Sequence, residues 1–339
     1  MKFFASLALL TAVISLTVDA APTSSSVVKV NLMKNDLPEY FTWLQKSRIN
    51  RNRALLKYSN NIRTAYNHGL VGQEAIVKLE SASTPVFGKN GNGNSGQGVV
   101  NNPLKDEGMD IGYHGPIQIS DQTFDVIFDT GSADLWVPAL ECSDAACKAH
   151  KSFDPKKSKG FKSDNKPFQI RYGTGEVSGI IAVDDVSIAG AVAKGQTFGL
   201  STKMSEDFEN TEFDGILGMG LDQLSSTNGK TPFSQLVAQN AVKDSVFGFF
   251  LGRQKDGSDS QLTLGGADSS KFTGQLKYNK LVGDAGYWEI ALDDASVNGK
   301  PLGFSKKTAI IDTGTTLLIA PPADADAIHK AINGSVSQQ

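Results

Sequence analysis

Two segments of the chain carry the same short pattern, and this repeat constrains the fold more than any other feature. Residues 126–138 read VIFDTGSADLWVP and residues 308–320 read TAIIDTGTTLLIA, so an Asp-Thr-Gly turn follows an apolar run in each. The two aspartates, Asp129 and Asp312, lie 183 residues apart. Internal duplication accounts best for such a repeat, so we expect two lobes that each contribute one loop.

The residues beside each aspartate suit a close approach of the two loops. Each loop has a threonine that can bond across to the other loop, a glycine that permits a sharp turn, and a hydroxyl near its own carboxylate. These residues are Thr130, Gly131 and Ser132 in the first loop and Thr313, Gly314 and Thr315 in the second. Two carboxylates about 3 Å apart cannot both ionise comfortably, so one keeps a proton. Such a pair can deprotonate a water and protonate a carbonyl in one step.

The first 21 residues have the form of a secretory signal peptide. Lys2 precedes an apolar run over 3–18, and a small-x-small cleavage site follows it. No other stretch approaches the length of a membrane span, so we expect a secreted or vacuolar protein without a membrane anchor. Under oxidising conditions the two cysteines, Cys142 and Cys147, fit one small disulfide loop, whereas free thiols suit a secreted protein poorly.

A basic leader, residues 22–102, precedes an acidic body. Residues 22–105 hold eleven Lys and Arg against four Asp and Glu, a net charge of +7, whereas residues 106–339 carry −10. Residues 38–66 have loosely helical spacing, and 88–103 form a Gly/Asn-rich linker by composition. The charges predict that the leader lies against the body. A nucleic-acid-binding arm is the alternative, but no binding motif accompanies the basic residues.

From about residue 108 the residue pattern becomes typical of an all-β protein. Short apolar or alternating runs recur, with Gly, Asp, Asn or Ser between them. These runs cover 112–120, 124–131, 168–188, 245–252, 260–266, 273–278, 287–299 and 309–320. One clear helix is predicted, over 231–242, with Thr231 as its N-cap before Pro232. A barrel or sandwich follows.

From about residue 108 the chain also resembles the pepsin-like aspartic proteases, peptidase family A1, of the fungal secreted or vacuolar type. The likeness rests on IFDTGSADLWVP, the later IIDTGTT, RYGTG at 171–175 and FDGILGMG at 213–220, in family order. CSDAAC, GGAD and YWEIALD match smaller family signatures. The resemblance implies a bilobal all-β acid protease fold, with residues 213–220 packed beneath the first Asp loop and the basic leader acting as a propeptide.

The resemblance also implies roles for particular residues. Asp129 and Asp312 would be the catalytic pair. Tyr172, Gly173 and Thr174 would form a flap over an extended polypeptide substrate, with Tyr172 bonded to Trp136. No metal or cofactor is expected, because the four histidines lack the HExxH spacing.

Two features depart from the family pattern. The first hairpin, ISDQTF at 119–124, is about two residues shorter and lacks a Gly-Thr-Pro turn. The supporting Ile216 lies 87 residues after Asp129, so its counterpart in the second lobe would fall near position 399 of a 339-residue chain. We therefore expect a signal peptide (1–21), a propeptide (22–102), a first lobe (103–272) and an incomplete second lobe (273–339).

The leading hypothesis is an endopeptidase that hydrolyses polypeptides at acid pH through water activated by the aspartate pair. We expect a monomer that binds polypeptides and its own propeptide, and no nucleic acid. One alternative is a non-catalytic relative that acts as a binding or inhibitor-like protein, which the two retained aspartates disfavour. Another is an enzyme that completes its second lobe by pairing with a second chain. Asn333 begins an Asn-Gly-Ser sequon and is a candidate for glycosylation.

Overall fold

The computed structural model describes residues 31–32, 99–107, 111–172, 175–253, 257 and 259–332. The predicted signal peptide, nearly all of the leader, Gly173, Thr174 and Asn333 lie outside these residues. In the part of the chain that the structure describes, no helix is long and apolar enough to cross a membrane.

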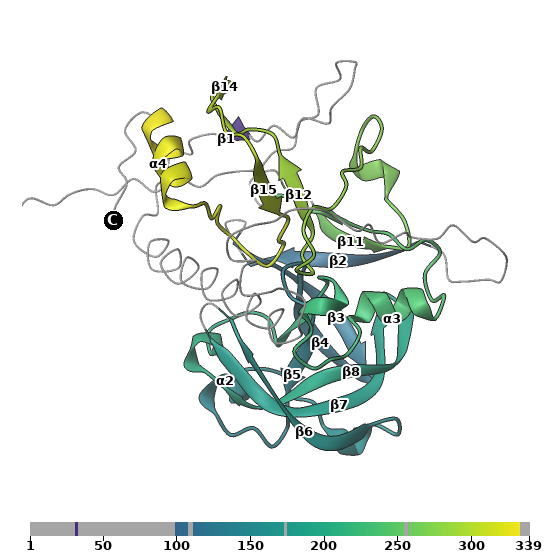
Figure 1. Cartoon of the computed structure of the whole chain (residues 1–339). Coiled ribbons are helices and arrows are strands. Elements are labelled where there is room, and N and C mark those ends of the chain that lie inside the picture. Colours follow the sequence, from purple (N-terminus) through teal and green to yellow (C-terminus); the bar gives the residue numbers. More distant parts are fainter. Residues whose placement is uncertain are drawn as a thin grey trace, which may run out of the picture.

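A ten-stranded sheet dominates the structure, in the order β10-β11-β2-β3-β4-β9-β5-β8-β7-β6 (Figure 1). Its strands are β2 (Val100–Asp106), β3 (Tyr113–Ile119), β4 (Gln122–Asp129), β5 (Leu135–Pro138), β6 (Lys162–Arg171), β7 (Glu176–Ile188), β8 (Ala191–Met204), β9 (Gly215–Gly218), β10 (Phe247–Phe250) and β11 (Ser260–Leu264). An additional pairing between β3 and β7 closes the central strands into a barrel. The all-β prediction is confirmed, and the expected boundary at 102/103 lies inside β2.

The barrel is filled by the inward residues of its alternating strands. In β4, alternate side chains are buried, from Phe124 and Val126 to Phe128. They pack with Leu135, Phe198, Leu217 and other apolar residues in one continuous core. This core fixes the position of the chain where β4 ends, at Asp129.

The short first hairpin forms a regular tight turn. Ile119 pairs with Gln122, and the antiparallel register continues without interruption to His114 and Ile127. Ser120 adopts a φ of 53°, and its N–H donates to the carbonyl of Asp185 at 2.9 Å. The short turn therefore leaves the pairing of β3 with β4 regular.

Short helices and turns connect the strands. They are α2 (Ala145–Lys148), η2 (Pro155–Lys157), η3 (Glu206–Phe208), η4 (Asp222–Leu224), α3 (Pro232–Ala238) and η6 (Ser269–Lys271). The predicted helix is α3: Pro232 occupies its first turn and the Thr231 hydroxyl accepts the Ser234 N–H at 3.1 Å, which satisfies a free helix donor. The helix ends four residues before the predicted end at 242.

The remaining elements lie on one side of the barrel, above it in the view of Figure 1. They are β12 (Glu289–Leu292) paired with β15 (Lys307–Ile310), β13 (Ser296–Val297) paired with β14 (Lys300–Pro301), and α4 (Pro322–Ala331). A two-residue strand of the leader, β1 (Asn31–Leu32), runs parallel to β13.

The prediction of a strand over 273–278 is wrong. No strand is assigned there, and Leu276 and Tyr278 are exposed, Tyr278 to 76%. Alternation suggested a half-buried strand, but a strand needs a hydrogen-bonded neighbour. No described strand pairs with this segment.

Candidate active site

The first Asp loop is supported from beneath by β9. This strand runs parallel to β4, with Gly218 opposite Asp129. The Met219 N–H donates to the Asp129 carbonyl at 2.8 Å, and the Gly218 N–H donates to the Asp134 carbonyl at 3.0 Å. A Cβ on Gly218 would lie 2.5 Å from Ala133 backbone atoms, so only glycine fits this approach. β9 thus occupies the supporting position expected of residues 213–220.

The second Asp loop follows a much smaller sheet. Asp312 comes two residues after β15, which pairs only with β12 among the described strands. The Ile311 N–H donates to the Trp288 carbonyl at 3.0 Å, and the Trp288 ring N–H donates to the Met219 carbonyl at 2.8 Å. Trp288 therefore links the second loop to the chain that supports the first.

The two loops differ in burial. Asp129 is 2% exposed, and Phe128 before it is 1% exposed. Asp312 is only partly buried, and Ile311 before it is 50% exposed. The first aspartate thus belongs to a closed core, whereas the second depends on contacts with the other loop.

Those contacts are reciprocal hydrogen bonds between the two threonines. The Thr130 N–H donates to Thr313 Oγ1 at 3.0 Å, and the Thr313 N–H donates to Thr130 Oγ1 at 2.9 Å. The Thr130 hydroxyl donates to the Ile311 carbonyl at 2.7 Å, and the Thr313 hydroxyl donates to the Phe128 carbonyl at 2.6 Å. Each threonine therefore uses its donors and acceptor on the opposite loop, so the two loops are held in one relative position.

Each carboxylate accepts the same pair of hydrogen bonds from its own loop. Asp129 accepts from the Gly131 N–H at 2.9 Å and from the Ser132 hydroxyl at 2.5 Å. Asp312 accepts from the Gly314 N–H at 2.9 Å and from the Thr315 hydroxyl at 2.5 Å. These bonds fix the orientation of both carboxylates.

The glycines show how closely the carboxylates approach the opposite loop. A Cβ on Gly131 would lie 2.5 Å from the Asp312 carboxylate, and a Cβ on Gly314 would overlap that of Asp129. Each carboxylate therefore occupies space that a side chain of the opposite loop would fill. The two Asp-Thr-Gly turns therefore face each other, with each carboxylate against the glycine of the opposite loop.

Tyr172 and Trp136 lie beside the first loop. The Trp136 ring N–H donates to the Tyr172 hydroxyl at 2.8 Å, and both rings are buried. Tyr172 directly follows the end of β6 at Arg171, and its N–H donates to the Gly175 carbonyl at 2.7 Å, which closes the hairpin before β7 begins. Burial holds the pKa of Tyr172 well above its ordinary value, and the charges of Asp134 and Asp129 add to this shift. The phenol thus stays protonated.

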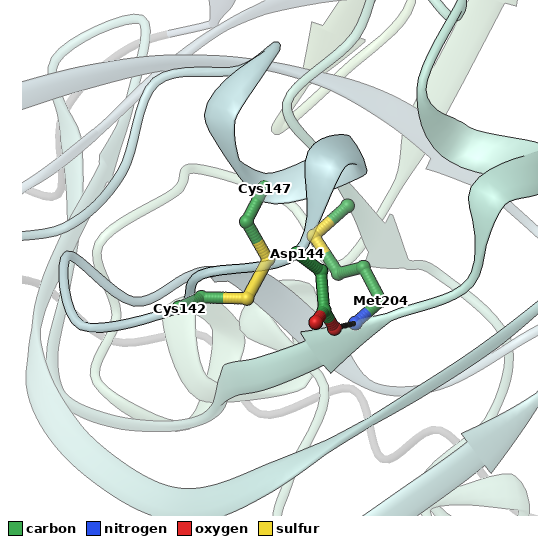
Figure 2. Close-up of a disulfide and its surroundings, with 4 residues drawn as sticks. All are labelled: Cys142, Asp144, Cys147 and Met204. Atoms are coloured by element: carbon green, nitrogen blue, oxygen red, sulfur yellow. Dashed lines mark hydrogen bonds between the residues drawn. A yellow bond between two sulfur atoms is a disulfide. The ribbon is translucent and has the colours of Figure 1, made fainter.

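The two cysteines form the predicted disulfide, Cys142–Cys147 (Figure 2). The Asp144 carboxylate lies within 4.8 Å of both sulfur atoms. Because the sulfurs are bonded to each other, they cannot act as thiolate ligands for a metal.

Asp134 is a buried residue of this region that the sequence reasoning missed. Its carboxylate accepts from the Ser225 and Thr227 hydroxyls at 2.8 and 2.9 Å and from the Ser226 and Thr227 N–H groups at 2.8 and 3.1 Å. It therefore ties the chain after the first Asp loop to a segment about ninety residues later. A charged residue inside the apolar run ADLWVP was the one available signal.

Comparison with known proteins agrees with this geometry. The model of the eukaryotic aspartyl protease family matches residues 112–339. The chain belongs to this family. Cathepsin E of Rattus norvegicus is 42% identical over 70% of this chain and 60% of its own length. Aspartic-type endopeptidase ctsD of Aspergillus fumigatus is 38% identical over 69% of this chain and 50% of its own length.

Cathepsin E of Mus musculus is 43% identical over 70% of this chain and 60% of its own length. The chain thus spans about half to three fifths of the length of these curated relatives. The family predicted from the paired Asp-Thr-Gly motifs is confirmed.

Proposed function

We propose that this aspartyl protease relative is an endopeptidase that hydrolyses peptide bonds of polypeptides at acid pH. The observation that carries the proposal is the reciprocal approach of the two loops, in which Gly131 lies against Asp312 and Gly314 against Asp129. Two acids held this way share one proton, so one can act as base while the other acts as acid.

The reaction follows from the two protonation states. The ionised carboxylate takes a proton from a water between Asp129 and Asp312, and the protonated carboxyl donates to the substrate carbonyl. The water oxygen bonds to the carbonyl carbon, which becomes a tetrahedral diol without a covalent bond to the enzyme. The diol then collapses: the carboxyl that took the proton from water gives it to the amide nitrogen, the other carboxylate takes a proton from a diol hydroxyl, and the carbon–nitrogen bond breaks to release the amine and the acid. Ser132 and Thr315 keep the carboxylates oriented through these steps.

An extended substrate would lie between the aspartates and the hairpin that ends at Tyr172. We assign residues 172–174 to a flap that covers the substrate backbone and excludes water from the reacting carbonyl. The Trp136–Tyr172 hydrogen bond supports this role, because it gives the aromatic end of the flap a defined position.

The basic leader fits the role of a propeptide that covers the site before activation. Its charge is opposite to that of the body, and β1 pairs with β13. At low pH, body carboxylates become protonated and the attraction weakens, which releases the leader. The signal peptide supports passage through the secretory pathway to the vacuole or the cell exterior.

A time course of intact mass after acidification to about pH 3.5, where carboxylates begin to protonate, tests the proposal. Wild type should lose its leader and cleave added polypeptide, whereas Asp129→Asn should stay intact and inactive while remaining folded. Asp121→Asn is a matched control, because Asp121 is exposed in the hairpin turn. Undiminished turnover by Asp129→Asn, or a fully active form that retains the leader, would contradict the proposal.

A further inference from the structure

The disulfide loop lies against the chain that carries η3. Cys142–Cys147 closes a short loop whose second half is α2 (Figure 2). Asp144, inside this loop, accepts the Met204 N–H at 3.0 Å, as the dashed line in Figure 2 shows. The loop is therefore attached to the end of β8, directly before η3 begins.

His150 makes a second attachment, two residues after α2. Its ring Nε2 lies 2.7 Å from the Phe208 carbonyl. Because a carbonyl only accepts, Nε2 must carry the proton and donate it. The Thr211 hydroxyl donates to the same carbonyl at 2.9 Å. The Thr211 N–H also donates to it at 3.2 Å, so three donors hold the Phe208 carbonyl, and His150 is the one that comes from a segment 58 residues earlier.

Phe208 lies beneath the end of the proposed flap. Its side chain is 2% exposed, with ring centroids 5.3 Å from Trp136 and 6.3 Å from Tyr172, both edge-on. A Cβ on Gly175 would lie 2.5 Å from the Phe208 ring. Both ends of the turn, Tyr172 and Gly175, therefore rest on this one ring.

The backbone joins the same two segments. The Ser205 N–H donates to the Glu176 carbonyl at 3.0 Å, and the Glu176 N–H donates to the Ser205 hydroxyl at 2.9 Å. Because η3 contacts the hairpin on both sides of its turn, a displacement of η3 must displace the turn.

We infer that His150 is a positioning residue for Tyr172: it holds the Phe208 carbonyl, and the Phe208 ring packs against the Tyr172 ring. This inference rests on the proposed function only where it assigns Tyr172 a role in covering the substrate. The bond to Phe208 orients the ring against which Trp136 and Tyr172 pack. Without it, Thr211 still holds the carbonyl, so the lobe should fold while the flap end becomes less ordered.

Hydrogen exchange measured by mass spectrometry tests this inference independently of catalysis. In His150→Ala, the amides of Tyr172, Glu176 and 205–211 should exchange about fivefold faster, the loss expected for one net hydrogen bond. Peptides from β3 and β4 should be unchanged. His150→Gln, which retains a side-chain N–H donor, should restore most of the protection, and Lys148→Ala, an exposed change on α2, should match wild type.

Peptide hydrolysis gives the functional readout. His150→Ala should lower kcat/KM about fivefold, because the same hydrogen bond to the Phe208 carbonyl is lost. His150→Gln should restore kcat/KM. Unchanged flap exchange in His150→Ala overturns the inference, as does a uniform increase across the barrel or a failure of His150→Gln to restore protection. If wild type cleaves no peptide, the proposed function fails, while the exchange comparison still decides the role of His150.

Discussion

The hydrogen bonds between the two threonines predict a measurable loss of stability when one hydroxyl is removed. Thr130→Val keeps the shape of the side chain but loses its bonds to the Ile311 carbonyl and the Thr313 N–H. At about 1 kcal/mol net per bond, the free energy of unfolding should fall by about 2 kcal/mol. The half-exposed Ile311 lets water satisfy its carbonyl, so a larger penalty is not expected.

Urea unfolding at neutral pH, followed by tryptophan fluorescence and circular dichroism, measures this loss. Thr313→Val should cost a similar amount, because its hydroxyl makes the equivalent bonds to Phe128 and Thr130. Thr123→Val is the matched control, an exposed threonine on β4 that should shift the value by less than about 0.5 kcal/mol. If Thr130→Val is as stable as this control, the bonds between the loops do not hold the site together.

Three further predictions follow from named contacts. Gly314→Ala places a methyl group against the Asp129 carboxylate. Peptidase activity should therefore fall at least about a hundredfold in a kinetic assay. The melting curve of the barrel should stay close to that of wild type. Burial lowers the pKa of His114 below its ordinary 6.5 in the folded protein. As the pH falls, the His114 imidazole of the unfolded chain is therefore protonated before that of the folded chain. The free energy of unfolding should decrease as the pH drops below 6.5. His114→Phe should lose less melting temperature than wild type between pH 7.5 and 5; an equal loss would contradict the sign. Replacing both Cys142 and Cys147 by serine should lower the urea-unfolding free energy by about 2 kcal/mol, the chain-entropy value for so short a loop, and unchanged stability would contradict it.

The sequence predicted the features that depend on neighbouring residues or on a repeated motif. The two Asp-Thr-Gly segments predicted the contacts of Thr130 and Thr313, because a duplicated loop implies a symmetric partner. The start of α3 could be predicted from Thr231 and Pro232 alone, since capping depends on adjacent residues.

What the sequence did not predict depends on partners far along the chain. The roles of Asp134 and His150 could not be predicted, because their hydrogen-bond partners lie 91 to 93 and 58 residues away. The 14-residue strand β8 was not identified, because Gly195 and Gly199 interrupt its alternation and its order comes from pairing with β7. The false strand over 273–278 is the converse case, an alternating segment that pairs with none of the described strands.

The different support of the two aspartates has a consequence for how the molecule opens. Asp129 belongs to the cooperative unit of the closed barrel, whereas Asp312 follows a two-stranded ribbon that contacts the barrel through a few hydrogen bonds and one small apolar cluster. Such a ribbon has a low free energy of local opening, so it separates from the barrel before the barrel itself unfolds. On heating, the paired acids should therefore part while most of the backbone remains ordered, so inactivation and global melting are two events with different midpoints.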